Sequence, residues 1–144
     1  MTLSGQTRVA AVLGWPISHS LSPSMHNYWL KENGIDGVYI PLAINPNKIA
    51  NFIKLLPHIG FAGVNLTVPH KETAMMFVDD VDSLAKRVGA INTIVITKDG
   101  SLEGRNTDVF GFKEALNQNT GTDIIKDGIA VVIGAGGASR AIVV

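Results

Sequence analysis

Residues 9–44, VAAVLGWPISHSLSPSMHNYWLKENGIDGVYIPLAI, decide the fold class. The stretch opens with the apolar run Val9–Leu13, which ends at Gly14, a pattern typical of a buried strand. It closes with a second apolar run, Val38–Ile44, and a helix-like segment separates the two runs. Strand, helix and strand in this order predict a βαβ unit, in which the two strands are parallel.

The segment between these strands carries signals for the start and the end of a helix. Ser22-Pro23 has the pattern of an N-cap residue followed by proline in the first turn. Met25, Tyr28 and Trp29 follow at i, i+3, i+4 spacing, which predicts an apolar face. Gly34 stands where a C-terminal cap belongs.

The same alternation continues along the chain. The further predicted elements are a helix carrying Ile49, Phe52, Ile53 and Leu56, a strand over Ala62–Val68, a helix over His70–Phe77, a hairpin of Ile91–Thr97 and Leu102–Arg105, a helix from Thr107 to about Gln118, and a strand over Ile129–Ile133. We therefore expect an α/β protein with a mainly parallel sheet flanked by helices. The last strand, with the glycine turn and helix after it, predicts the start of a Rossmann-like domain.

The organisation changes near residue 106. We expect residues 1–106 to form one α/β domain, and residues 107–144 to form a linking helix and the truncated start of a dinucleotide-binding domain. Asn117–Gly128 is polar and contains glycine, which makes it the best candidate linker. Residues 129–144 are fewer than the roughly 30 that a βαβ unit needs, so we expect the N-terminal part of a longer protein.

Composition excludes several classes of protein. Of the 144 residues, 46 % are hydrophobic and 17 % are charged, and 12 basic residues balance 12 acidic ones. A disordered chain needs lower hydrophobicity and higher net charge, and binding to nucleic acid or anionic lipid needs clustered basic residues. There is no cysteine, and no apolar run reaches the roughly 18 residues of a membrane span. We expect a cytoplasmic protein without disulfides, thiol catalysis or a histidine-based metal site.

The run Gly134-Ala135-Gly136-Gly137-Ala138 follows an apolar stretch and precedes a helical one. In that context glycines permit a tight turn and bring the backbone close to a pyrophosphate at the helix N-terminus. The interpretation as a nucleotide site is favoured over a plain tight turn. The residue that separates NAD from NADP would lie about 20 positions further on, beyond residue 144.

Two polar stretches lie where predicted strands end. Ser20 and Ser22 carry hydroxyl groups next to a predicted helix N-terminus. These hydroxyls either cap the helix or bind a carboxylate or a phosphate. Asn65 and Thr67 alternate on one face of a predicted strand, and Lys71 follows at its C-terminal end, where open α/β sheets bind ligands. Taken alone, Lys71 has the pattern of an ordinary solvated lysine.

Two further polar residues stand in apolar surroundings. Asn92 lies in a predicted strand, where its amide needs hydrogen-bond partners from the protein or from a ligand. Thr107 or Asp108 is either a simple N-cap of the next helix or part of a site.

In their order along the chain, five motifs resemble the shikimate dehydrogenase family, and the similarity runs from about residue 8 to the end. The motifs are GWPISHSLSP at 14–23 with Met25-His26-Asn27, NLTVPHK at 65–71, GAINT at 89–93, GRNTD at 104–108 with Gly111, and GAGGASRA at 134–141. Each motif alone is modestly specific, but five in order are very specific.

The resemblance implies a reversible reduction of 3-dehydroshikimate to shikimate with NADPH, in the chorismate pathway to aromatic amino acids. It implies that Lys71 and Asp108 form the catalytic pair. The substrate-binding residues that it implies are Ser20, Ser22, Asn65, Thr67, Lys71, Asn92 and Asp108. The residues that it implies for the cofactor pyrophosphate are Gly134, Ala135, Gly136, Gly137 and Ala138. No metal site is expected, because the sequence shows no spacing typical of metal ligands.

Family members are roughly twice this length, with the active site in the cleft between two domains. This chain is therefore expected to be the substrate-binding part and to be inactive alone. The alternatives are a quinate/shikimate dehydrogenase paralogue that accepts NAD, and a non-catalytic shikimate-binding protein. The expected partner is a small-molecule substrate, with no nucleic acid and no membrane, and the choice between monomer and homodimer is open.

Overall fold

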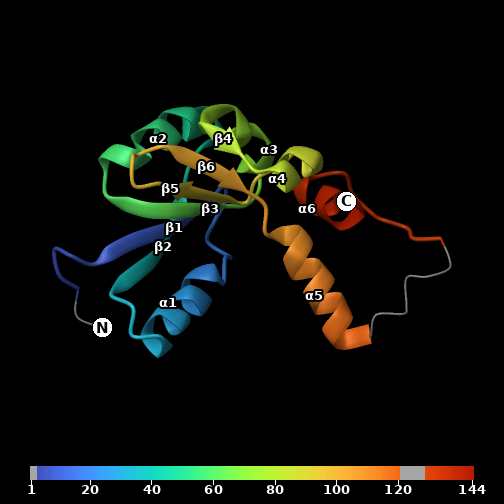
Figure 1. Cartoon of the computed structure of the whole chain (residues 1–144), viewed down its shortest axis with the longest axis horizontal. Coiled ribbons are helices and arrows are strands. Elements are labelled where there is room, and N and C mark those ends of the chain that lie inside the picture. The colour runs from blue at the N-terminus through green and yellow to red at the C-terminus, as the bar shows by residue number, and fades with distance from the viewer. Residues whose placement is uncertain (1–2, 121–128) are drawn as a thin grey trace.

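One six-stranded sheet organises the computed structural model, which describes residues 3–120 and 129–144 (Figure 1). The strand order is β2-β1-β3-β5-β6-β4. The strands are β1 (Arg8–Gly14), β2 (Gly37–Ala43), β3 (Phe61–Leu66), β4 (Asp80–Val81), β5 (Thr93–Ile96) and β6 (Leu102–Arg105). The α-helices are α1 (Ser22–Glu32), α2 (Ile49–Leu55), α3 (His70–Thr73), α4 (Ser83–Val88), α5 (Asp108–Thr120) and α6 (Gly137–Val143). Short 3-10 turns cover Pro46–Lys48, Leu56–His58 and Ala74–Phe77.

The sheet is parallel in its first half and mixed in its second. β1 pairs in parallel with β2 and β3, as the strand-helix-strand pattern predicts. β5 is antiparallel to both β3 and β6, which confirms the predicted hairpin, and β4 joins the far edge parallel to β6. The α/β class and the flanking helices are confirmed, and the hairpin makes the sheet mixed.

Helices cover the two faces of the sheet unequally (Figure 1). One face packs on α2, the 3-10 turn after α3, and α4. Its buried side chains are Ala11, Leu13, Ile49, Ile53, Leu56, Val64, Leu66, Ala74, Val81, Ala85, Ile91, Ile94 and Leu102. The other face holds a smaller cluster of Val12, Ile17 and Tyr39, against which Leu30 of α1 packs. The alternation of side chains along β1 therefore supplies both layers.

The start of α1 differs from the prediction. The helix begins at Ser22 itself, the N-cap position is Leu21, and no side chain caps the helix. Instead the Ser20 hydroxyl accepts a hydrogen bond from the Ser22 backbone N–H at 3.3 Å. The predicted C-terminal signal is confirmed, because Gly34 follows the helix with φ of +62°, a conformation that glycine adopts without strain.

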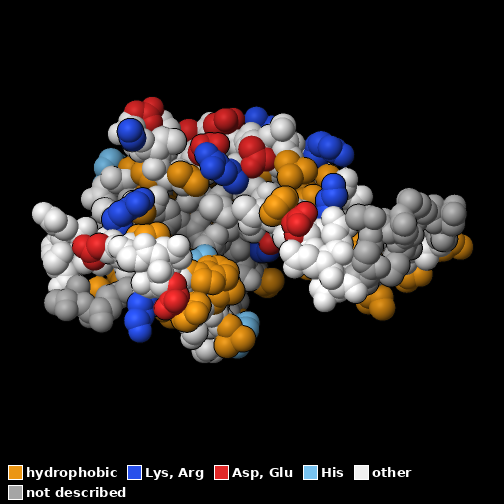
Figure 2. All heavy atoms as spheres, turned by 60° about the horizontal axis from the view of Figure 1, so that its bottom comes forward, with side chains coloured by type: hydrophobic (Ala, Val, Ile, Leu, Met, Phe, Trp, Pro, Cys, Tyr) orange, Lys and Arg blue, Asp and Glu red, His pale blue; other side chains and the backbone are white. Residues whose placement is uncertain are grey.

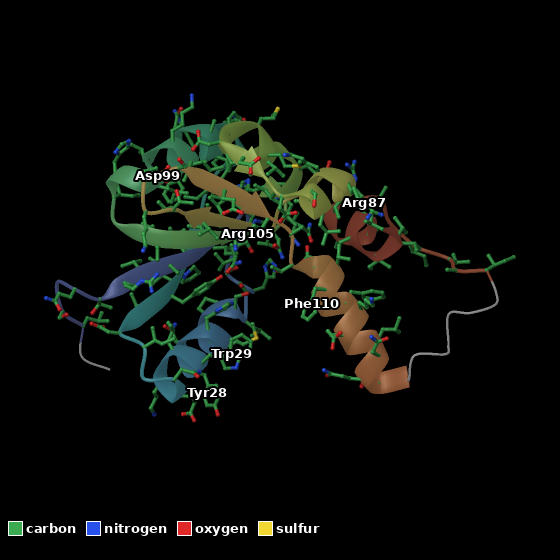
Figure 3. All side chains as sticks on the ribbon, viewed as in Figure 1. Tyr28, Trp29, Arg87, Asp99, Arg105 and Phe110 are labelled. Atoms are coloured by element: carbon green, nitrogen blue, oxygen red, sulfur yellow. The ribbon has the colours of Figure 1, made fainter. Side chains whose placement is uncertain are left out.

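The predicted apolar face of α1 is not buried. Met25, Tyr28 and Trp29 are 44 %, 60 % and 48 % exposed, and hydrophobic side chains gather on this side of the molecule (Figure 2; Tyr28 and Trp29 are labelled in Figure 3). A polar contact orients the helix instead. The side chain of Asn27 binds both backbone groups of Tyr39: it donates to the carbonyl at 2.8 Å and accepts from the N–H at 2.9 Å. These groups lie on the open side of the edge strand β2, so they anchor α1 there.

The predicted strand at Ile129–Ile133 is wrong. These residues form no strand, and Ile129, Val131 and Ile133 are 95 %, 81 % and 97 % exposed. A strand requires a neighbour with which to exchange backbone hydrogen bonds, and none of the described strands pairs with this segment. The helix predicted after it does form, and Ala141 of α6 is buried against Val88 and Ala90.

The region before this segment is helical for longer than predicted. α5 extends to Thr120 rather than ending near Gln118, so the first residues of the predicted linker are helical. The rest of that linker, 121–128, lies outside the described residues. None of the described helices is long and apolar enough to cross a membrane.

The sequence analysis missed two elements, β4 and α4. Asp82 precedes α4 as its N-cap, and its Oδ1 accepts from the Ala85 N–H at 2.6 Å. Gly89 ends the helix with φ of +70°. Asp and Gly are common residues at the N-terminal and C-terminal caps of helices, so α4 could have been predicted from the sequence.

Gly63 should not tolerate a side chain. It lies in β3 opposite Val95, and a Cβ there would come within 2.6 Å of the backbone oxygen of Ile94. Because that oxygen belongs to a strand and cannot rotate away, Gly63→Ala should lower the free energy of unfolding by about 1–3 kcal/mol in urea denaturation. Gly5→Ala is the control, because open space surrounds that position. Equal stability of the two variants would contradict the close approach of β3 and β5.

His70 should make stability depend on pH. Its side chain is 1 % exposed, and its Nε2–H donates to the carbonyl of Ile44 at 2.9 Å. Burial lowers the pKa of His70 below 6.5, against the weaker opposing effect of that hydrogen bond. The folded state therefore binds the proton less readily than the unfolded state, so this contribution to stability is complete above pH 6.5 and is lost as the pH falls through the folded pKa.

Urea unfolding between about pH 7.5 and about pH 5 measures this effect. His70→Gln should show a shallower fall in the free energy of unfolding than the parent chain. His58→Gln, at an exposed histidine, should fall as steeply as the parent. If His70→Gln also falls as steeply, the buried imidazole is not responsible.

Candidate active site

Four segments end or begin where the C-terminal ends of β1 and β3 meet, and this side of the sheet is called the ligand-binding edge below. β1 and β3 are parallel, so their C-terminal ends meet there, and β6 also ends there, because Arg105 pairs with Thr93 at the start of β5. Backbone hydrogen bonds join the loops at this edge, from Thr67 N to Leu13 O at 2.9 Å and from Trp15 N to Val68 O at 3.1 Å. Residues that follow these strands are thereby brought together, as the sequence analysis expected of a ligand-binding edge.

Lys71 and Asp108, the predicted catalytic pair, form an ion pair at this edge. Lys71 Nζ lies 2.6 Å from Asp108 Oδ2, and the two side chains are 18 % and 29 % exposed. Lys71 lies in α3, directly after the end of β3, and Ile91 N–H donates to its backbone carbonyl at 2.8 Å. Asp108 opens α5, where the positive end of the helix dipole favours a carboxylate. Both groups are ordered by the protein and remain accessible to a ligand.

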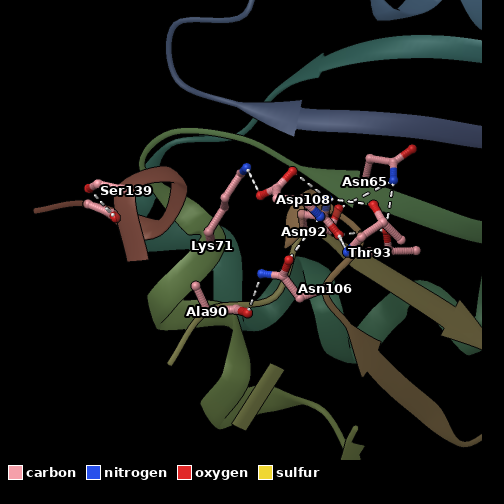
Figure 4. A network of polar contacts seen from close by, with 10 residues as sticks. Asn65, Lys71, Ala90, Asn92, Thr93, Asn106, Asp108 and Ser139 are labelled. Atoms are coloured by element: carbon pink, nitrogen blue, oxygen red, sulfur yellow. Dashed lines mark hydrogen bonds and ion pairs between the residues drawn. The ribbon is translucent and has the colours of Figure 1, made fainter. Parts of the chain in front are cut away.

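Asn92 holds Asp108 from the side away from Lys71 (Figure 4). Its Nδ2 donates to Asp108 Oδ1 and to Thr107 Oγ1, each at 2.8 Å. Its Oδ1 accepts from the Thr107 backbone N–H and from the Thr93 hydroxyl, each at 3.0 Å. These bonds use the whole hydrogen-bonding capacity of the amide. A ligand hydroxyl that binds Asn92 would therefore replace one of these partners.

Asn65 joins the same network through Thr93. Its Nδ2 donates to Thr93 Oγ1 at 3.0 Å and to the backbone carbonyl of Asn92 at 3.3 Å. Its Oδ1 accepts from the Tyr39 hydroxyl at 2.7 Å, and burial raises the pKa of Tyr39 to about 12. Both amide hydrogens are used inside the protein, whereas one lone pair of Oδ1 is left for a ligand.

The unused hydrogen-bonding capacity defines what the site can bind. The ammonium of Lys71 has three N–H groups, of which one binds Asp108. The carboxylate of Asp108 has lone pairs beyond those that Lys71 and Asn92 occupy, and Asn65 offers one more acceptor. The edge therefore suits a ligand with several hydroxyl donors and an oxygen that accepts from an ammonium group, which is the pattern of a polyol or a hydroxylated ketone.

The remaining predicted substrate residues lie at the same edge but outside this network. A Cβ at Gly14 would come within 2.6 Å of Thr67 Cγ2, so the end of β1 and the residue after β3 are in contact. Ser20, in the loop after β1, and Ser22, the first residue of α1, are half-buried, and the Ser22 N–H donates to the Ser20 hydroxyl. Within the described residues, the hydroxyls of Thr67 and Ser22 have no protein partner, which leaves them available to a ligand.

The predicted glycine loop lies beside Lys71. Gly136 is the N-cap of α6, and a Cβ at Gly137 would come within 3.2 Å of Ala90 Cβ and 3.4 Å of Lys71 Cβ. Arg140 of α6 also forms an ion pair with Glu72 at 3.3 Å, which ties this helix to α3. The bare Cα of Gly137 therefore permits α6 to approach Lys71.

A cavity of about 530 Å³ borders this loop. The residues that line it include Gly136–Ser139, Val131–Ile133, Val68 and Phe112. At Gly136 a Cβ would meet nothing within 4 Å, and Gly134 has φ of +121°, which only glycine adopts readily. These features match what a glycine loop needs for contact with a pyrophosphate, although the strand predicted before the loop is not formed.

Sequence reasoning missed Tyr39, Thr93 and Asn106 as parts of the network. Asn106 is 5 % exposed, donates to Ala90 O at 2.9 Å and accepts from Asp108 N–H at 2.9 Å, so it fixes the start of α5. Its place in a polar run before a predicted helix was the available signal. Within the described residues, no group of acidic and histidine side chains could hold a metal ion.

Comparison with known proteins identifies the family of the chain. The family model described as the shikimate dehydrogenase substrate binding domain matches residues 12–94. The shikimate dehydrogenase (NADP(+)) of Paramagnetospirillum magneticum is 55 % identical over 141 residues, which are 98 % of this chain and 51 % of that protein. The one from Rhodospirillum rubrum is 51 % identical over 140 residues. The chain spans about half the length of the curated relatives that it matches.

Solved structures give the same result. The structure aligns with a shikimate dehydrogenase crystallised with NADP+ at a TM-score of 0.92 and 38 % identity, covering 99 % of this chain and 48 % of that one. A Thermus thermophilus enzyme in complex with NADP(H) and shikimate aligns at a TM-score of 0.84 and 42 % identity, over 94 % of this chain and 50 % of the other. With a matching family model over more than half its length and these relatives, the chain belongs to the shikimate dehydrogenase family.

Proposed function

We propose that this chain is the substrate-binding part of an NADPH-dependent shikimate dehydrogenase, which interconverts 3-dehydroshikimate and shikimate. The observation that carries the proposal is the ion pair of Lys71 and Asp108, with 2.6 Å between Nζ and Oδ2, at the ligand-binding edge of the sheet. The relatives with this fold carry the same name, and one was crystallised with both NADP(H) and shikimate. A cytoplasmic location is part of the proposal.

The substrate would be held through its hydroxyls and its carboxylate. The lone pairs left on Asp108 and on Asn65 Oδ1 would accept from ring hydroxyls. Thr67, two residues after Asn65, would add a hydroxyl that has no partner among the described residues. Ser20 lies in the loop before α1 and Ser22 is the first residue of that helix, and both would donate to the carboxylate. Asn92 would act mainly by fixing the carboxylate of Asp108, because its own capacity is already used.

Lys71 would be the proton donor of the reduction. The cofactor, when bound, supplies a hydride to the carbonyl carbon, and the oxygen then carries negative charge. The Lys71 ammonium has N–H groups free to donate to that oxygen, and Asp108 keeps it oriented. The donated proton completes the alcohol, and in the reverse direction the resulting amine accepts the hydroxyl proton. A positioned acid–base group of this kind contributes about 10²- to 10⁴-fold in rate.

The glycine loop would hold the pyrophosphate of the cofactor. Gly134, Ala135, Gly136, Gly137 and Ala138 border the cavity or lie next to the residues that do, and Gly137 packs against the Lys71 side chain. This contact would bring the cofactor site and the proton donor together. NADP is the proposed cofactor because the curated relatives carry it in their names, although a Listeria monocytogenes relative was crystallised with NAD and shikimate.

Lys71→Ala should lower the turnover number strongly and should change the affinity for shikimate only slightly. Because the chain spans half of its relatives, the test uses a chimera of residues 1–144 and the second half of the P. magneticum enzyme, assayed by shikimate-dependent reduction of NADP+. Loss of the proton acceptor should lower kcat by about 10²- to 10⁴-fold. The Kd for shikimate should change only a few-fold, since the ring hydroxyls keep their other partners.

Lys54→Ala, at an exposed lysine of α2, is the matched control and should behave as the parent chimera. Parent-like turnover of Lys71→Ala would show that Lys71 has no acid–base role. Quinate and NAD+ are run as alternative substrate and cofactor in the same assay. Higher kcat/KM with quinate, or binding of shikimate without any turnover, would replace the proposed function by that of a paralogue or of a non-catalytic binder.

A further inference from the structure

The side-chain amides of Asn65 and Asn92 belong to one chain of hydrogen bonds that runs from β2 to the catalytic pair (Figure 4 shows the part from Asn65 to Lys71). An amide has a donor end and an acceptor end of nearly the same shape, so its orientation depends on its neighbours. Groups that can only donate or only accept determine the direction of this chain.

Next to Asp108, the side-chain amide of Asn92 can adopt only one orientation. The backbone N–H of Thr107 can only donate, and it points at Asn92 Oδ1 at 3.0 Å. The ionised carboxylate of Asp108 can only accept, and it lies 2.8 Å from Asn92 Nδ2. Both contacts require the same orientation of the amide.

The orientation of Asn92 determines that of Asn65. Since Asn92 Oδ1 is an acceptor, the Thr93 hydroxyl must donate to it and has only a lone pair left for Asn65. The backbone carbonyl of Asn92 can also only accept, and it faces the same end of Asn65 at 3.3 Å. The NH2 group of Asn65 therefore faces Thr93, and its oxygen faces Tyr39.

Tyr39 closes the chain as its outermost donor. Its hydroxyl lies 2.7 Å from Asn65 Oδ1, and the residue is 4 % exposed. Its ring stacks on the imidazole of His26 with centroids 4.1 Å apart and an interplanar angle of 7°, and Asn27 binds both of its backbone groups. α1 thus holds the phenol in place, and the pKa of about 12 keeps it protonated near neutral pH.

We infer that Tyr39 and Thr93 are positioning residues of the active site. Together they fix the amides so that Asn65 presents an oxygen, and not an NH2 group, to a ligand, and so that Asn92 presents its NH2 group to Asp108. A flipped Asn65 would offer a donor where the ligand has a hydroxyl donor. The consequence for shikimate rests on the proposed function, but the orientation of the amides does not.

A purely structural role for Tyr39 predicts different results. If the ring only fills the core, Tyr39→Phe keeps the packing and leaves the environment of the Asn65 side chain unchanged. If the hydroxyl helps to orient Asn65, its loss leaves the amide oxygen without its buried donor and removes one of the three contacts that fix the amide, so the environment of the NH2 group changes. Stability alone does not separate these cases, whereas the amide signals and the ligand affinity do.

The test is NMR spectroscopy of the 144-residue chain labelled with ¹⁵N-asparagine. Tyr39→Phe should shift the side-chain NH2 signals of Asn65 and weaken shikimate binding by about 2- to 10-fold, the equivalent of one net hydrogen bond. Tyr28→Phe is the matched control, because Tyr28 is the only other tyrosine and is 60 % exposed. It should leave both measurements unchanged.

Substitutions of Thr93 test the link between Asn65 and Asn92. Thr93→Val removes the hydroxyl and should perturb the NH2 signals of both Asn65 and Asn92, whereas Thr93→Ser keeps the hydroxyl and should restore them. This pair also decides the question if Tyr39→Phe does not fold. Parent-like amide signals in both Tyr39→Phe and Thr93→Val would overturn the inference. Absence of shikimate binding by the parent chain would count against the proposed function alone, because the amide signals would still report the orientation.

Discussion

The arrangement of the ligand-binding edge depends on the hydrogen bonds of a single buried residue, Asn92. Its backbone joins two strands, since its N–H donates to Arg105 O at 2.9 Å and its carbonyl accepts from Leu66 N–H at 2.8 Å. Its side chain binds Asp108 and Thr107 at the start of α5. Each buried polar group left without a partner costs about 1–3 kcal/mol, so the requirement to satisfy this one residue sets the positions of β3, β6 and α5 relative to one another.

The same constraint explains why the ion pair of Lys71 and Asp108 is ordered and still has room for a ligand. Asp108 is held on one side by Asn92 and on the other by Lys71, which rises from the helix after β3. Neither ion is deeply buried, so neither bears the large desolvation penalty of a closed ion pair, and both keep hydrogen-bonding capacity for a ligand. The glycine loop lies against the lysine because Gly137 has no side chain. The residues proposed for substrate binding, for proton transfer and for the cofactor therefore lie at one edge of the sheet.

Local patterns were sufficient to predict the strands β1, β2 and β3, the hairpin, and the edge at which Asn65 and Lys71 lie. The family resemblance, and not a local pattern, added Asn92 and Asp108 to the same site. Features that depend on distant partners were not predictable. The apolar run Ile129–Ile133 looks like a strand, but a strand exists only with a neighbour. The spacing of Met25, Tyr28 and Trp29 correctly predicts a helix but not its orientation, because Asn27 and not these apolar residues contacts the sheet. The relay through Tyr39 and Thr93 joins residues that lie far apart in the sequence, which no local pattern shows.

The central claim is that the edge around Lys71 and Asp108 binds a hydroxylated ring through the donors and acceptors that the protein leaves unused. A crystal structure of the chain soaked with shikimate tests it most directly. The account predicts ring hydroxyls within hydrogen-bond distance of Lys71 Nζ, of the Asp108 carboxylate and of Asn65 Oδ1, with the carboxylate of the ligand near Ser20 and Ser22. Shikimate bound at another place, or with its carboxylate against Lys71, would contradict it.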